Sequence, residues 1–199
     1  MKKLFTLLSL LVLAATVNAQ QLSAEDRAAG LAYLEKTRAG VVEAAKGLSD
    51  AQLAFKPAPD KWSVAQVLEH IASAEDMLFG MVTGQVMNAP APEPGGDVKA
   101  TDAMILKAIP DRSQKRSAPE PLIPTNRYGS AAEALKHFGE SRAKTIALMK
   151  DAADLRAHAA DSPLGKLDGY QWLLFIAAHS ERHTKQMLEV KANPDFPKS

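Results

Sequence analysis

Residues 62–71 read WSVAQVLEHI, and this segment contains the clearest helix start in the chain. Ser63 and Gln66 have the spacing of a capping box, in which each side chain bonds the backbone N–H of the other residue. Trp62 and Val67 have the spacing of a hydrophobic staple, which fixes the direction in which the chain enters a helix. Apolar residues then recur at intervals of three and four, so the segment predicts an amphipathic helix.

Three further long helices are expected from the same kinds of pattern. Ser23 reads as an N-cap, Ser130 opens a second capping box, and Asp168 caps the last helix. The expected spans are residues 24–47, 64 to between 83 and 88, 131–155, and 169–193. Four amphipathic helices of this length pack against one another as a bundle. The predicted fold class is therefore all-α, an antiparallel four-helix bundle.

A long proline-rich connection separates the second and third helices. Residues 89–128 hold seven of the twelve prolines and are interrupted by one short predicted helix, Thr101–Ile109. A connection of this length in a compact domain usually has a function, and we expect it to form a lid over a site in the bundle. The chain shows almost no strand pattern and no internal repeat.

Composition excludes several classes of protein. The 199 residues include 24 Lys+Arg, 23 Asp+Glu, five His and no Cys. Without cysteine there is no disulfide framework, no thiolate zinc finger, no Fe–S cluster and no cysteine nucleophile, so a metal would be held by His and carboxylates. No block of basic residues follows the first few positions, which argues against nucleic acid binding.

The first residues have the pattern of a secretory signal peptide. Lys2 and Lys3 form a positive n-region, residues 4–15 are apolar, and Ala19 completes a small-residue cleavage motif. We expect cleavage after Ala19 and export to the periplasm or medium, with no stable membrane insertion afterwards. Residues 20–199 are expected to form one domain, and a homodimer is possible.

His179 and His183 are the main candidates for chemistry. Residues four apart lie on one face of a helix, so two imidazoles at this spacing can bind one cation. Both continue the inward stripe of Trp172 and Ile176. His70 lies one turn after Val67 and can face inward from the second helix as a third ligand. The alternative interpretation is that these are interior histidines satisfied by ordinary hydrogen bonds.

We expect other positions and roles for the remaining polar residues of these helices. Gln186, one turn beyond His183, is placed to orient a ligand or substrate. Arg182 is expected to point sideways and form an interhelical ion pair. His137 and His158 are expected at the surface, and three acids are expected on solvated helix flanks: Glu69, Glu75 and Glu181.

Two segments together resemble a known family, the DinB-like metal-binding four-helix bundles. They are WSVAQVLEHI at residues 62–71 and HSERHTKQ at residues 179–186, and the resemblance spans about residues 22–191. It implies that His70, His179 and His183 bind a divalent ion such as zinc or nickel. Relatives of this fold include thiol-dependent S-transferases and a maleylpyruvate isomerase, whose thiol cofactors are chiefly cytoplasmic.

Three neutral imidazoles leave a divalent ion with an open coordination position, as in catalytic zinc sites. Such an ion can lower the pKa of water toward about 7 or activate a thiolate. The resemblance to DinB-like proteins therefore implies a metal-dependent hydrolase or thiol-type transferase acting on a small molecule. The alternative is a non-catalytic metal- or ligand-binding bundle.

Overall fold

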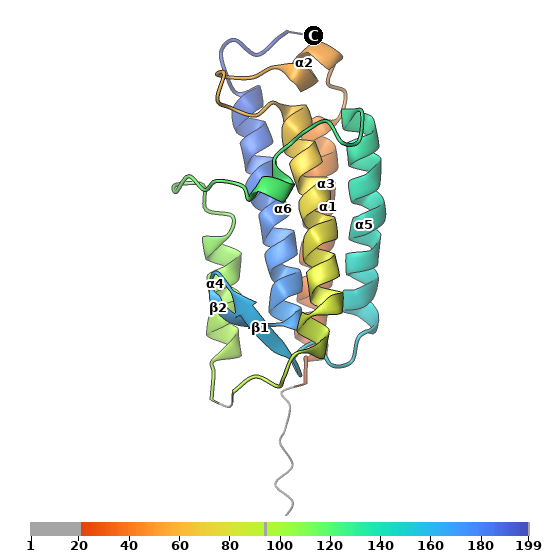
Figure 1. Cartoon of the computed structure of the whole chain (residues 1–199), viewed down its shortest axis with the longest axis vertical. Helices are drawn as coiled ribbons and strands as arrows, with labels where there is room; N and C mark the ends of the chain where they lie inside the picture. Colours follow the sequence, from red (N-terminus) through yellow and green to blue (C-terminus); the bar gives the residue numbers. More distant parts are fainter. Residues whose placement is uncertain (1–20, 94, 199) are drawn as a thin grey trace, which may run out of the picture.

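The computed structural model describes residues 21–93 and 95–198, and four long helices dominate it (Figure 1). These helices are α1 (Ala24–Ala45), α3 (Val64–Gly84), α5 (Ala131–Asp151) and α6 (Gly169–Lys191). The short helix α2 (Asp50–Ala54) lies at the end of the bundle where α1 ends and α3 begins. The predicted four-helix bundle is confirmed.

The helices do not simply alternate in direction around the bundle. The N-terminal end of α6 contacts that of α1, because the Tyr170 hydroxyl donates to the Asp26 carbonyl, and Lys191 at the other end of α6 bonds the Ala44 carbonyl of α1. These two helices are therefore parallel. Figure 1 shows α3 and α5 running together in the opposite direction. This arrangement follows from the long connection, which returns the chain to the starting end of α3 before α5 begins.

The starts of α3 and α6 are built as the sequence predicts, whereas the box predicted at Ser130 is half formed. The Ser130 hydroxyl accepts from the Glu133 N–H, but among the described residues the Glu133 side chain makes no return bond to the Ser130 backbone. In the capping box of α3, the Ser63 hydroxyl accepts from the Gln66 backbone, and the Gln66 side chain accepts from the Ser63 backbone. Asp168 and Gln171 form a second reciprocal box at α6. Local caps of this kind satisfy N–H groups that a helix cannot pair internally, so each fixes the residue at which its helix begins.

The connection between α3 and α5 contains more structure than expected. It includes two 3₁₀ turns, η1 (Val86–Asn88) and η2 (Glu120–Leu122), and the helix α4 (Val98–Ala108). α4 begins three residues before the predicted Thr101, because Asp97 caps it. Arg156 joins α4 to the start of α6 by pairing with Asp102 at 2.6 Å and Asp168 at 2.8 Å.

A small β-hairpin is the element that the sequence analysis missed. β1 (Ala159–Ser162) pairs antiparallel with β2 (Gly165–Asp168) just before α6. Each strand has four residues and includes charged or small polar side chains, so neither shows a clear apolar alternation. Gly165 adopts a positive φ of 96° in the turn, a conformation that glycine tolerates well.

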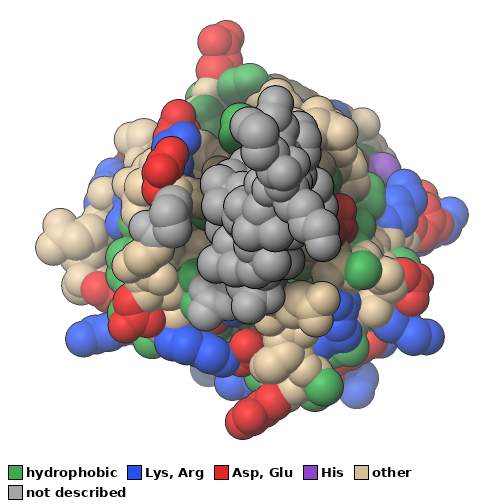
Figure 2. Space-filling view, turned by 90° about the horizontal axis from the view of Figure 1, so that it is seen from below, with side chains coloured by type: hydrophobic (Ala, Val, Ile, Leu, Met, Phe, Trp, Pro, Cys, Tyr) green, Lys and Arg blue, Asp and Glu red, His purple; other side chains and the backbone are tan. Residues whose placement is uncertain are grey.

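Charge is distributed without a large single-sign region on the face drawn in Figure 2, where acidic and basic side chains are interspersed. None of the helices in residues 21–93 and 95–198 has both the length and the apolar composition that a bilayer-spanning helix needs. The predicted signal peptide, residues 1–19, lies outside the described residues.

Gly169 is expected to be sensitive to substitution because a Cβ there would lie 2.8 Å from the Leu155 carbonyl oxygen. That oxygen is fixed, since it accepts a hydrogen bond from the Tyr170 N–H. We expect Gly169→Ala to destabilise the protein by about 1–3 kcal/mol, the usual range for overpacking. The measurement is the free energy of unfolding in urea.

Gly139 is the matched control, because no atom lies within 4 Å of a Cβ built there in α5. Gly139→Ala should stabilise the protein by up to about 1 kcal/mol, since alanine is the better helix former. Equal effects of the two substitutions would show that the packing at Gly169 is not as described.

Candidate metal centre

Three histidine side chains from α3 and α6 meet inside the bundle. The Nε2 atoms of His70 and His183 are 3.1 Å apart, those of His179 and His183 are 3.1 Å apart, and those of His70 and His179 are 3.4 Å apart. His70 and His183 are buried, and His179 is half-buried. Thus all three predicted ligand residues come together, although His70 is more than a hundred residues from the other two.

In His70 and His183 the other ring nitrogen, Nδ1, already makes a hydrogen bond. The Nδ1–H of His70 donates to the Leu122 carbonyl at 2.9 Å, which can only accept. The Nδ1 of His183 lies 2.8 Å from Gln186 Oε1, and that oxygen also only accepts. Both rings therefore carry their proton on Nδ1 when neutral, and their Nε2 lone pairs point toward the shared centre.

Burial keeps the imidazoles neutral. It lowers the pKa of His179 to about 3, and the neighbouring His70, Arg182 and Arg142 act in the same direction. Burial is also the main cause that lowers the pKa values of His70 and His183. At neutral pH the three rings are in the form that binds metal ions.

This donor set fits a divalent transition metal ion. His179 can donate at most one Nε2–H, so hydrogen bonding leaves at least one of the other two Nε2 lone pairs unsatisfied, whereas a cation at the centre would bind all three nitrogens. Nitrogens that share a tetrahedral ion at about 2.0–2.1 Å lie roughly 3.3–3.4 Å apart, close to the observed separations. Among residues 21–93 and 95–198, these three are the only group of His, Asp or Glu with convergent ligand atoms.

Trp62 lies beside the centre. Its ring centroid is 5.0 Å from that of His70 at an interplanar angle of 49°. The side chain also packs against the apolar cluster around Val67, as a staple residue should. Trp62 therefore has a second role that the staple pattern does not predict: its ring covers one side of His70, a proposed metal ligand.

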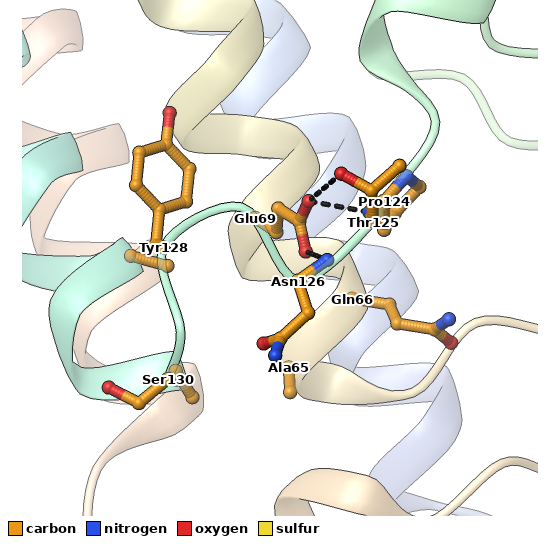
Figure 3. A pocket seen from close by; sticks show the side chains of 10 residues that line it. Ala65, Gln66, Glu69, Pro124, Thr125, Asn126, Tyr128 and Ser130 are labelled. Atoms are coloured by element: carbon orange, nitrogen blue, oxygen red, sulfur yellow. Dashed lines mark hydrogen bonds between the residues drawn. The ribbon is translucent and has the colours of Figure 1, made fainter.

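The prediction that Glu69 and Glu75 lie on solvated flanks is wrong. Glu69 is 6% exposed and accepts hydrogen bonds from the backbone N–H groups of residues 125–127, as Figure 3 shows for Thr125 and Asn126. Burial alone would raise the pKa of Glu69, but these bonds and that from Arg127 outweigh burial and lower it. Glu75 is 2% exposed and pairs with Arg142.

The pocket in Figure 3 is separate from the histidines. It has a volume of about 210 Å³ and is lined by Glu69 and the loop that precedes α5, but by none of the three imidazoles. Since the oxygens of Glu69 already accept four or more N–H groups, this carboxylate holds the loop in place. Asn126, in that loop, has a positive φ of 65°.

Arg182 also differs from its prediction. It points away from the histidines as expected, but no ion pair forms among the described residues, and its guanidinium donates to backbone carbonyls instead. Glu181 is half-buried between Lys185 and the Tyr33 hydroxyl, so the expectation of a fully solvated acid is only partly met. Gln186, expected to orient a ligand or substrate, bonds the Nδ1 of His183, one of the three candidate ligand residues.

The two remaining histidines lie away from the centre. His137 is partly exposed, as expected, and contacts Asp76. His158, also expected at the surface, is more buried than predicted because its Nδ1–H donates to the Ala89 carbonyl. Neither contributes a nitrogen to the group of three.

The lowered pKa values predict a pH dependence of stability for the metal-free protein. In the unfolded chain these imidazoles take up protons near their ordinary pKa of about 6.5, whereas the folded state resists protonation until lower pH. Their contribution to stability is therefore complete above pH about 6.5 and is lost as the pH falls. We expect a lower urea midpoint at pH 5.5 than at pH 7.5. An unchanged or higher midpoint at pH 5.5 would contradict this.

Comparison with known proteins gives three findings. A family model described as the DinB superfamily matches residues 33–187. The protein YuaE of Bacillus subtilis (strain 168), itself uncharacterised, is 30% identical over 149 residues, which is 73% of this chain and 87% of YuaE.

Among solved structures, the chain is similar to YfiT from Bacillus subtilis, with a TM-score of 0.55 and 16% identity. The alignment covers 89% of this chain and 93% of that one. YfiT is described as "a probable metal-dependent hydrolase with an unusual four-helix bundle topology". At this level of identity the likeness establishes a shared fold.

Proposed function

This chain belongs to the DinB superfamily, and from that premise we propose that it is an exported metal-dependent hydrolase of a small-molecule substrate, with zinc or nickel held by His70, His179 and His183. The observation that carries the proposal is the convergence of three Nε2 atoms within 3.4 Å of one another, two of them on rings whose Nδ1 is already bonded. The description of YfiT, which shares the fold, as "a probable metal-dependent hydrolase" supports it.

The proposed chemistry divides between the ion and the chain. His70, His179 and His183 would hold a divalent ion, which would supply Lewis acidity toward water and carbonyl oxygens. The chain keeps the three rings neutral, and it buries and fixes two of them, His70 and His183, through hydrogen bonds at Nδ1. Burial strengthens electrostatic interactions at the site. Trp62 provides an apolar and aromatic surface next to His70.

The two buried carboxylates of α3 are already bonded to other groups. Glu69 is occupied by loop N–H groups, and Glu75 by Arg142 and Thr145. The proposal therefore assigns no general base to either acid. It predicts that Glu69→Gln affects activity through the position of the loop rather than through a proton transfer.

The test uses the purified mature protein after chelation and after reloading with Zn²⁺ or Ni²⁺. A panel of esters and amides is followed by absorbance, with and without an added thiol and an electrophilic acceptor. Hydrolysis that disappears on chelation and returns with metal supports the proposal. Turnover that requires the thiol would instead identify a transferase. Tight binding of one ion with no turnover would identify a non-catalytic metal-binding bundle.

Export is tested separately. The apolar segment and the Val-Asn-Ala motif that ends at Ala19 support cleavage there. Mass spectrometry of the protein from the periplasmic or secreted fraction of a bacterial host should give a chain that begins at Gln20. An intact chain confined to the cytoplasm would contradict export and would make a cytoplasmic thiol substrate more plausible.

A further inference from the structure

Residues 109–122, here called the strap, link α4 to the bundle at η2. Figure 1 shows this segment leaving the end of α4 and returning at η2 in front of α3 and α6. These are the two helices that carry the three histidines. The strap therefore lies where it can contact both sides of the metal centre.

One end of the strap holds His70. The Leu122 carbonyl accepts the Nδ1–H of this ring at 2.9 Å, and Leu122 itself is buried. A carbonyl at this position fixes both the tautomer and the rotation of the ring. The position of Leu122 therefore determines where His70 Nε2 points.

The other end of the strap is attached to α6 through Arg182. This guanidinium is buried, and its donors reach the carbonyls of Gln114 at 2.7 Å, Ile109 at 3.5 Å, and Asp111. Three carbonyls from a single irregular segment converge on one planar group. Removal of this guanidinium would leave these three carbonyls without their protein donor, and the strap would lose its attachment to α6 at this point.

A second contact joins the strap to His183. Arg112 forms a two-pronged ion pair with Glu189, both distances being 2.6 Å, and its Nη1 approaches Gln186 Oε1 at 3.5 Å. The same Oε1 accepts the Nδ1–H of His183. Because Arg112 can only donate, it favours the amide orientation that presents oxygen to His183.

We propose that the strap is a positioning element for the metal centre, and that Arg182 is the residue that fixes it to the helix of His179 and His183. The proposal rests on the metal centre of the proposed function but not on hydrolysis. It goes beyond a lid, because the strap's backbone and Arg112 set the orientation of two ligand rings. Outer partners of metal-binding histidines typically change metal affinity by about 10–100-fold.

The chain offers a closely matched control for Arg182. Arg27 on α1 also donates to three backbone carbonyls, those of Met149, Lys150 and Ala152 at the end of α5. Neither Arg27 nor these carbonyls contacts the three histidines. Arg182→Met and Arg27→Met therefore remove the same type of contact, but only the first releases the strap.

The experiment measures the dissociation constant for Zn²⁺ alone by competition with a chromophoric chelator. We expect Arg182→Met to weaken Zn²⁺ binding by about 10-fold or more and Arg27→Met to leave it within about 2-fold of the original protein. Circular dichroism and thermal unfolding of the metal-free variants check that both fold. Arg182→Lys keeps the positive charge but lacks the planar set of donors that reaches several carbonyls at once. This variant replaces Arg182→Met in the test if the Met variant does not fold, and it should also weaken Zn²⁺ binding.

Equal Zn²⁺ affinities of the original protein, Arg182→Lys and Arg182→Met would overturn the positioning role while leaving the metal centre intact. Equal losses in Arg182→Met and Arg27→Met would also overturn it, because stability alone would then explain the effect. If the original protein binds no Zn²⁺, both this proposal and the proposed function fail.

Discussion

His183→Ala is expected to lose its bound ion and its metal-dependent turnover together. His183 is the only ring that lies 3.1 Å from both of the other ligand nitrogens, so its loss leaves two imidazoles that are 3.4 Å apart. Two ligands rarely hold a metal tightly. We therefore expect the metal affinity to fall by more than about 100-fold, which exceeds the usual effect of removing a hydrogen-bond partner of a metal-binding histidine. Elemental analysis after dialysis and the ester and amide assay are the measurements.

His137→Ala is the control for this prediction. It removes an imidazole of the same size from a partly exposed position, where the ring contacts only Asp76 and Tyr128 among the described side chains. Metal content and turnover should remain unchanged. If His183→Ala retains one ion per chain, the ligand assignment is wrong. If it loses the ion but also fails to fold without metal, the centre is structural.

Glu75→Gln is expected to cause a large loss of stability. The Glu75 carboxylate accepts from Arg142 Nε at 2.8 Å, Arg142 Nη2 at 2.7 Å and Thr145 at 2.6 Å, all in the buried interior. Substitution leaves the Arg142 charge unbalanced and turns an amide NH₂ toward groups that also donate. Breaking one side of a buried ion pair costs about 3–5 kcal/mol. Urea unfolding of the metal-free protein measures the change.

Glu35→Gln tests the same chemical change at the surface. Glu35 pairs with Arg38 at 2.8 Å, but both side chains are more than two-fifths exposed. Exposed pairs contribute at most about 1 kcal/mol, so this variant should remain near the original stability. A Glu75→Gln effect no larger than that of Glu35→Gln would contradict the importance of the buried pair.

The Glu75 network also shows why part of the interior could not be predicted from sequence. Arg142 joins Glu75 of α3 to the Leu34 carbonyl and Thr37 of α1 and to Ser180 of α6, so that one guanidinium connects all four helices. Glu75 and Arg142 are 67 residues apart, and nothing in the local pattern of either helix indicates the pairing. A charged residue on a helix is usually solvated, and that general tendency gave the wrong expectation here.

Helix starts and the convergence of the three histidines could be predicted because they depend largely on short spacings. A capping box is complete within four residues, and His179 and His183 lie on one helix face wherever that helix packs. His70 has no second histidine on its own helix, but its position one turn after Val67 places it on the inward face, where it can meet the pair. The resemblance of residues 62–71 and 179–186 to DinB-like proteins indicated the same three residues.

The strap contacts lay beyond sequence reasoning for a different reason. Arg182 and His70 bond to backbone carbonyls, and every residue carries a carbonyl, so the sequence does not identify the acceptors. The β-hairpin was missed because its strands are short and contain few apolar residues. The strap contacts depend on how distant segments meet, whereas the hairpin is a local element with too weak a strand pattern to be recognised.

The most direct test of the metal centre is an anomalous difference map from a crystal of the Zn²⁺-loaded protein, collected at the zinc absorption edge. We expect one peak per chain at about 2.0–2.1 Å from the Nε2 atoms of His70, His179 and His183. A map without a peak among these rings, or with the zinc held elsewhere in the chain, would contradict the account.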